Sequence, residues 1–133
     1  MKILYIDYGN VVSDNHIYRY YGDLFRELQS LAQVYLLQGV PADINNIIKA
    51  FPQNSHAMGA LTSLEAALST FYPESKNIDD ADENYRSMCR LIAQVPILAA
   101  NFYRHSQGLD FINPDDSLDY AENFLNMMSS LRN

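Results

Sequence analysis

The sequence predicts a mainly α-helical protein with a short β-hairpin at its N-terminus. Apolar residues recur at three- and four-residue spacing over long stretches, which indicates helices with one buried face. Glycine, proline or acidic residues stand where most of these stretches begin or end. A short β-branched and aromatic run near the start indicates strands. With 133 residues, 48% of them hydrophobic, the chain is expected to form one domain over residues 1–133.

The expected strands lie within residues 1–13. Residues 3–7 form the first, which Gly9-Asn10 stops, and Val11-Val12 closes the hairpin. Helices are then expected from residue 23 to residue 131. The first ends at Gly39, with Pro41 shortly after it. Its predicted buried face consists of Leu24, Phe25, Leu28, Leu31, Ala32, Tyr35 and Leu36.

Two shorter helices are expected next. Asp43 is predicted to cap one that stops near Pro52. Asn54-Ser55-His56 is predicted to cap another over residues 57–71, which Tyr72-Pro73 ends. Small side chains on this helix would let another helix approach closely: Gly59, Ala60, Ala66 and Ala67.

A cluster of carboxylates at residues 79–83 stands at the head of the longest predicted helix, which runs to about His105. Acidic side chains there oppose the positive end of the helix dipole. A divalent-cation site is the alternative, but no glycine-turned loop with alternating oxygen ligands follows the cluster. Pro96 should bend this helix and Gly108 should close it. A last helix is expected to begin near Pro114-Asp115.

Composition excludes several classes of function. A net charge of −7 and a pI near 4.7 make binding to nucleic acid or to anionic membranes unfavourable. No apolar run approaches the ~18 residues that a membrane span needs, and the run after Met1-Lys2 is too short for an export signal. Cys89 is the single cysteine, which fits a reducing, cytoplasmic location and a small buried side chain.

The three histidines form no recognisable catalytic motif. His16 is expected in a loop, His56 at a helix start and His105 at a helix end. A nucleophile needs a base within hydrogen-bond reach, and no Cys–His pair, serine elbow or paired-histidine helix supplies one. We therefore predict no catalytic, cofactor-binding or metal-binding residue. The remaining alternative is a small independent enzyme that uses His56 with acids such as Glu65.

Several segments, in the same order along the chain, resemble the citrate synthase family. The similarity is strongest from about residue 47 onward and most specific near the end of the chain. The segments are Asn54-Ser55-His56-Ala57-Met58, residues 68–72, residues 90–96, residues 103–108, residues 111–114 and residues 117–128. Ala57 and Gln94 depart from the family pattern, which has proline and lysine there.

The resemblance implies a helical large-domain segment of the citrate synthase fold. It also implies a link to the condensation of an acyl-CoA with a 2-oxo acid, an acyltransferase reaction of the tricarboxylic acid cycle. In the family, the catalytic histidines, the catalytic aspartate and the arginines that hold oxaloacetate come later than the position of Asn133. We therefore expect a truncated or split protein with no cofactor of its own. Acyl-CoA would be a substrate only if a C-terminal half completed the site.

The resemblance further implies a subunit interface. In the family, the helices that correspond to residues 57–72 and 80–105 pack across the two-fold axis of a dimer. We expect a homodimer, or a heterodimer with a citrate synthase-like chain. The alternative is a non-catalytic module that binds itself or modulates a full-length synthase.

Overall fold

The structure is a computed structural model, and it describes residues 15–129. Within these residues it contains five α-helices, two short 3₁₀ helices and no strand, so the prediction of a mainly helical fold is confirmed. The hairpin predicted over residues 1–13 lies outside the described residues. The elements are α1 (Asn15–Gln38), α2 (Ala42–Ala50), α3 (Ala57–Leu68), η1 (Ser69–Phe71), η2 (Pro73–Lys76), α4 (Ala81–Ser106) and α5 (Tyr120–Ser129).

Helix α1 begins eight residues earlier than the predicted residue 23, at Asn15. The prediction began the helix at residue 23, but Gly22 does not stop it, because glycine inside a helix costs only about 1 kcal/mol relative to alanine. Ile17 and Tyr21 extend the spacing of Leu24 and Leu28 upstream, so the periodic pattern already covered this part. His16 consequently lies in a helix and not in a loop. The predicted C-terminal end is confirmed, with Gly39 at a φ of 73°.

Helix α4 follows the prediction closely. The Asp80 carboxylate accepts hydrogen bonds from the backbone N–H groups of Asp82 and Glu83, both at 3.1 Å, and so caps the helix. The helix continues through Pro96 to Ser106. Gly108 closes it with a φ of 69°, a left-handed conformation that glycine adopts readily.

Helix α5 begins at Tyr120 and not near Pro114. Asp115 instead forms a local turn, in which its carboxylate accepts from the N–H of Ser117 at 2.8 Å. Asp119 and Glu122 then make reciprocal side-chain to backbone bonds of 2.8 Å and 3.0 Å, which is a capping box. The acidic cap therefore lies one turn later than predicted.

The predicted cap of α2 also differs from the structure. Asp43 lies in the first turn of α2, and Pro41 precedes that helix without a side-chain cap.

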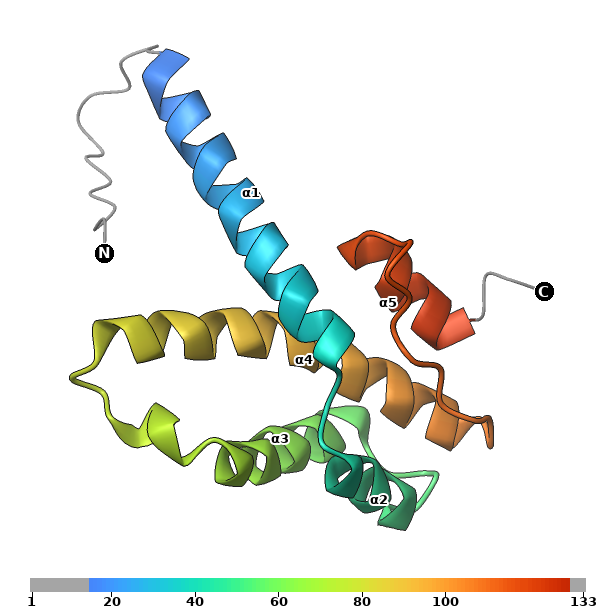
Figure 1. Cartoon of the computed structure of the whole chain (residues 1–133). Coiled ribbons are helices and arrows are strands. Elements are labelled where there is room, and N and C mark those ends of the chain that lie inside the picture. Colours follow the sequence, from blue (N-terminus) through green and yellow to red (C-terminus); the bar gives the residue numbers. More distant parts are fainter. Residues whose placement is uncertain (1–14, 130–133) are drawn as a thin grey trace.

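Helix α4 is the central element, and α1, α2, α3 and α5 all pack against it (Figure 1). Helix α3 runs antiparallel to α4, connected through η1 and η2, so the two form a helical hairpin (Figure 1). One core cluster joins α2, α3 and α4: Ile44, Ile48, Ala60, Leu64, Leu68, Leu98 and Phe102. A second joins α1, α4 and α5: Ala32, Leu36, Ala93, Ile97, Ala100 and Met127. No helix in residues 15–129 combines the length and apolar character needed to cross a membrane.

Candidate functional site

The first candidate site is an apolar stripe that runs along the exposed side of α4. We call it the outer face of α4, and it consists of Met88, Leu91, Ile92, Val95, Ala99 and Tyr103. Successive members are three or four residues apart or adjacent, so they share one side of a helix. Four of them are large and substantially exposed: 52% for Met88, 48% for Leu91, 44% for Ile92 and 43% for Tyr103. An uncovered apolar stripe of this length is typical of an interaction surface.

The outer face of α3 carries small side chains beyond the exposed Met58 in its first turn. Gly59, Thr62, Ser63 and Ala66 are all exposed and lie at helical spacing. A Cβ atom placed on Gly59 would meet nothing within 4 Å, so the chain's own packing does not require glycine there. The Thr62 and Ser63 hydroxyls each donate to the backbone carbonyl four residues earlier, at 2.8 Å. Side chains from Gly59 to Ala66 on this face are therefore small, and the hydroxyl donors of Thr62 and Ser63 are already satisfied.

The prediction that small residues on α3 face outward is only half right. Gly59 and Ala66 are exposed, whereas Ala60 is 5% exposed and belongs to the core, and Ala67 is half-buried. The outer face of α4 was not identified from the pattern. Apolar residues surround α4 on more than one side, and that excess over one core-facing stripe is the signal that could have revealed it.

Arg90 organises the space between the end of α3 and the first half of α4. Its guanidinium lies 4.1 Å from the ring centroid of Tyr72, a cation–π contact, and 3.7 Å from carboxylate oxygens of both Glu74 and Glu83. The Gln94 amide donates to the Tyr72 hydroxyl at 2.7 Å. Arg90, Tyr72 and Gln94 line a cavity of about 250 Å³, whose walls also include Leu91 of the outer face. The neutral Gln94 side chain is thus held by a hydrogen bond inside the chain.

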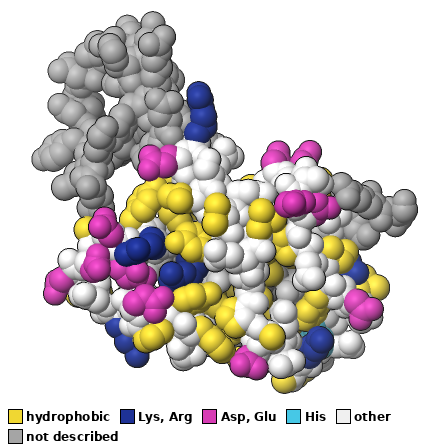
Figure 2. Space-filling view, viewed as in Figure 1, with side chains coloured by type: hydrophobic (Ala, Val, Ile, Leu, Met, Phe, Trp, Pro, Cys, Tyr) yellow, Lys and Arg dark blue, Asp and Glu magenta, His cyan; other side chains and the backbone are white. Residues whose placement is uncertain are grey.

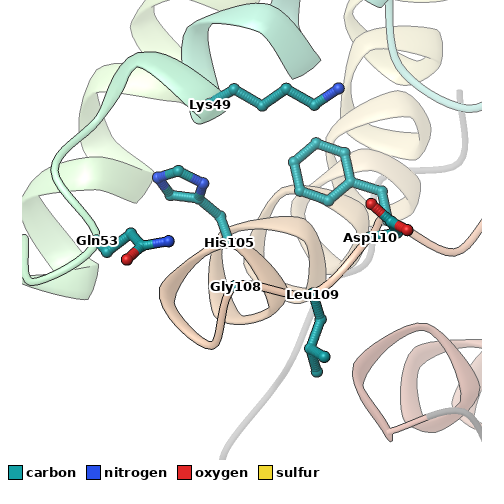
Figure 3. A pocket seen from close by; sticks show the side chains of 7 residues that line it. Lys49, Gln53, His105, Gly108, Leu109 and Asp110 are labelled. Carbon is teal, nitrogen blue, oxygen red and sulfur yellow. The ribbon is translucent and has the colours of Figure 1, made fainter.

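A second cavity, of about 330 Å³, lies between α2 and the end of α4. The His105 ring nitrogen Nε2 lies 2.7 Å from the Phe51 carbonyl oxygen, and the Lys49 ammonium lies 5.4 Å from the Phe111 ring centroid. Figure 3 shows the Gln53 amide directed toward His105, whereas Leu109 points away from it. The remaining lining residues are Gly108 and Asp110. His105 therefore contacts a backbone carbonyl, and no serine, threonine or cysteine lines this cavity.

The other predicted candidates take structural positions. His56 is exposed, and its Nδ1 accepts from the N–H of Met58 at 3.2 Å, so it caps α3 as predicted. Its use as a base beside Glu65 would break that cap. The side chain of His16 lies outside the described side chains. The acidic cluster supplies the Asp80 cap, and residues 15–129 contain no group of three or more acidic, histidine or cysteine side chains arranged to hold a metal.

Comparison with known proteins identifies the family to which this chain is similar. Residues 20–133 match the family model described as citrate synthase, C-terminal domain. The chain belongs to the citrate synthase family. Its fold matches the crystal structure of citrate synthase from Pyrobaculum aerophilum with a TM-score of 0.67 and 26% sequence identity. The match covers 81% of this chain but 28% of that chain, so the described helices correspond to a minor part of that synthase.

Proposed function

We propose that these 133 residues supply the dimerising helices of a citrate synthase-like protein and not its catalytic residues. Condensation of an acyl-CoA with a 2-oxo acid would then depend on groups that lie outside this sequence, either on a longer chain or on a partner chain. Family membership supports the reaction class. The uncovered outer face of α4 is the observation that supports the interface.

The outer faces of α3 and α4 suit isologous helix packing. Small residues on α3 allow a close approach of backbones, and the larger apolar side chains on α4 supply area to bury. Burying this stripe against a second copy would remove about 25 cal/mol of unfavourable hydration free energy per Å² of apolar surface. Figure 2 draws a different face of the molecule, in front of which α1 crosses α4; hydrophobic side chains also reach the surface there, and most acidic side chains lie nearer the edges.

The experiment that tests the interface is the solution mass of the chain, measured by size-exclusion chromatography with light scattering. We expect a dimer. Leu91→Glu places a charge on the outer face of α4 and should shift the mass to that of a monomer. Leu125→Glu is the matched control, because Leu125 is 52% exposed but lies on α5.

A monomeric parent chain, or equal dissociation by both variants, would contradict the proposed interface. Circular dichroism of each variant establishes that helix content is retained, so a loss of dimer is not confused with unfolding. A heterodimer with a citrate synthase-like chain is tested by mixing this chain with a tagged full-length synthase. The parent chain should be captured, and the Leu91→Glu variant should not.

A non-catalytic interaction module is the second candidate function. It is favoured by the histidines, because His56 caps a helix and His105 contacts a backbone carbonyl, so neither is held as a base. The two candidates differ in whether CoA is released when the C-terminal part of a citrate synthase is supplied separately with an acyl-CoA and a 2-oxo acid. Release that depends on this chain supports the split enzyme. Dimer formation without release supports the module.

We further propose a cytoplasmic location, which the lone, fully buried thiol of Cys89 supports. Fractionation of cells that express the chain with its own N-terminus tests this. Recovery in a membrane or exported fraction would contradict it.

A further inference from the structure

A polar cavity of about 320 Å³ lies between the end of α1, the start of α2 and the middle of α4, and residues 112–114 close its remaining side. Its walls include the side-chain amides of Asn45, Asn101 and Asn113, together with Gly39 and Val40. None of its lining residues carries a charge, and none belongs to the outer face of α3 or α4. This cavity is therefore independent of the proposed dimer interface.

Asn101 provides the strongest sign that the cavity takes a ligand. Its side chain belongs to a residue that is 3% exposed, and its Nδ2 donates to Asn45 Oδ1 at 3.0 Å. Its Oδ1, by contrast, has no hydrogen-bond partner among the described residues. A buried acceptor without a donor destabilises the fold, and such groups are rare in native proteins. Asn101 lines the cavity, and the soft terminal torsion of asparagine lets a bound donor reorient this oxygen.

We propose that the cavity binds a small uncharged molecule that donates hydrogen bonds, with a primary carboxamide as the complementary group. A carboxamide N–H would satisfy Asn101 Oδ1, and its carbonyl oxygen would accept from an asparagine amide on the wall. Charged ligands are disfavoured, because they would lose hydration in a cavity that offers no opposite charge. The amide walls thus select for hydrogen-bonding capacity and not for charge.

Acetamide and acetate form the test pair, because they have nearly the same shape but only acetamide is uncharged and donates N–H bonds. In the full chain labelled with nitrogen-15, acetamide should shift the side-chain amide resonances of Asn45 and Asn101 saturably, and acetate should not. Asn101→Leu removes the acceptor at similar size and should abolish the acetamide response. Gln53→Leu, which removes an exposed amide that lines a different cavity, should leave it unchanged.

Equal responses to acetamide and acetate, no saturable response to acetamide, or full binding by the Asn101→Leu variant would each overturn the proposal. If Asn101→Leu does not fold, Asn113→Leu replaces it, because Asn113 lies on an exposed part of the same cavity wall. That variant should weaken acetamide binding several-fold, and undiminished binding would equally count against the site.

Discussion

The two sides of α4 have similar composition and different surroundings. The inner side carries Cys89, Ala93, Ile97 and Ala100, all between 0% and 3% exposed, against α1 and α5. The outer face carries side chains that are just as apolar, yet Leu91 and its neighbours are close to half exposed. Helical spacing thus identifies faces that avoid water, but it does not say whether a face is covered by the same chain or by another.

Buried polar groups are a second difference between the two sides of α4. Arg104 is 9% exposed, and its guanidinium donates to the backbone carbonyl oxygens of Asp110 and, at 3.2 Å, of Met128. Gln94 and Asn101 are also buried and hydrogen-bonded. The covered sides of α4 therefore contain polar groups with specific partners inside this chain. The outer face is apolar apart from the Tyr103 hydroxyl, which suits a surface that meets an apolar partner.

The largest expected effect comes from shortening a buried side chain on the covered side of α4. Leu98→Ala should lower the free energy of unfolding by about 2–5 kcal/mol, because Leu98 is 0% exposed in the cluster shared with α2 and α3. Leu91→Ala on the outer face should change the unfolding free energy of the monomer by about 0.5 kcal/mol or less. Urea denaturation of both variants measures this, and similar losses would mean that the outer face is already covered within the chain.

Thiol labelling compares the two sides directly. Burial raises the pKa of the Cys89 thiol, so it should react slowly with an aromatic disulfide reagent in the native state. A cysteine introduced by Leu91→Cys should react at least about tenfold faster at low protein concentration, where it needs no opening of the fold. Its rate should fall as protein concentration rises and the dimer forms. A rate independent of concentration would argue against coverage by a second copy.

Substitution of Gly59 tests the stability of α3 and its close packing against a second copy separately. Gly59→Ala should stabilise the monomer by up to about 1 kcal/mol, because alanine favours the helix and the added Cβ meets nothing in this chain. If α3 packs closely against a second copy, the same change should weaken the dimer. Thermal unfolding under dilute conditions gives the first quantity, and the dissociation constant gives the second. Ala66→Ser, on the same face and of similar size, is the control for the dimer.

The smallest expected effect is a loss of stability at high pH. Burial raises the pKa of Tyr120, whose hydroxyl donates to the Ile92 carbonyl oxygen at 2.6 Å. The neutral phenol is therefore favoured in the folded state. Its contribution should be complete below the unfolded-state pKa of about 10 and should be lost as pH rises through the folded pKa. Denaturant titrations from pH 8 upward should show the advantage over Tyr120→Phe shrinking above that point, and a constant advantage would contradict it.

Much of the helical order followed from local chemistry. The acidic cluster that contains Asp80 was placed at the head of α4 because acidic side chains favour the positive end of a helix. Asn54-Ser55-His56 was predicted to cap α3 because polar side chains accept hydrogen bonds from free N–H groups at helix starts. Gly39 and Gly108 were identified as helix ends because glycine adopts, at little conformational cost, the left-handed conformation that ends a helix. The early start of α1 and the late start of α5 were missed. In the first case the apolar spacing upstream of residue 23 was not recognised, and in the second a local Asp115 turn competed with the helix.

The sequence by itself determined the helical class, the free and buried state of Cys89, and membership of the citrate synthase family, because spacing, capping and residue order are local properties. Only the tertiary structure decided which apolar sides are covered. It placed Ala60 in the core and left Gly59 open, and it left one oxygen of Asn101 without a partner. Coverage depends on which helices meet, and that is fixed by packing between segments far apart in the chain.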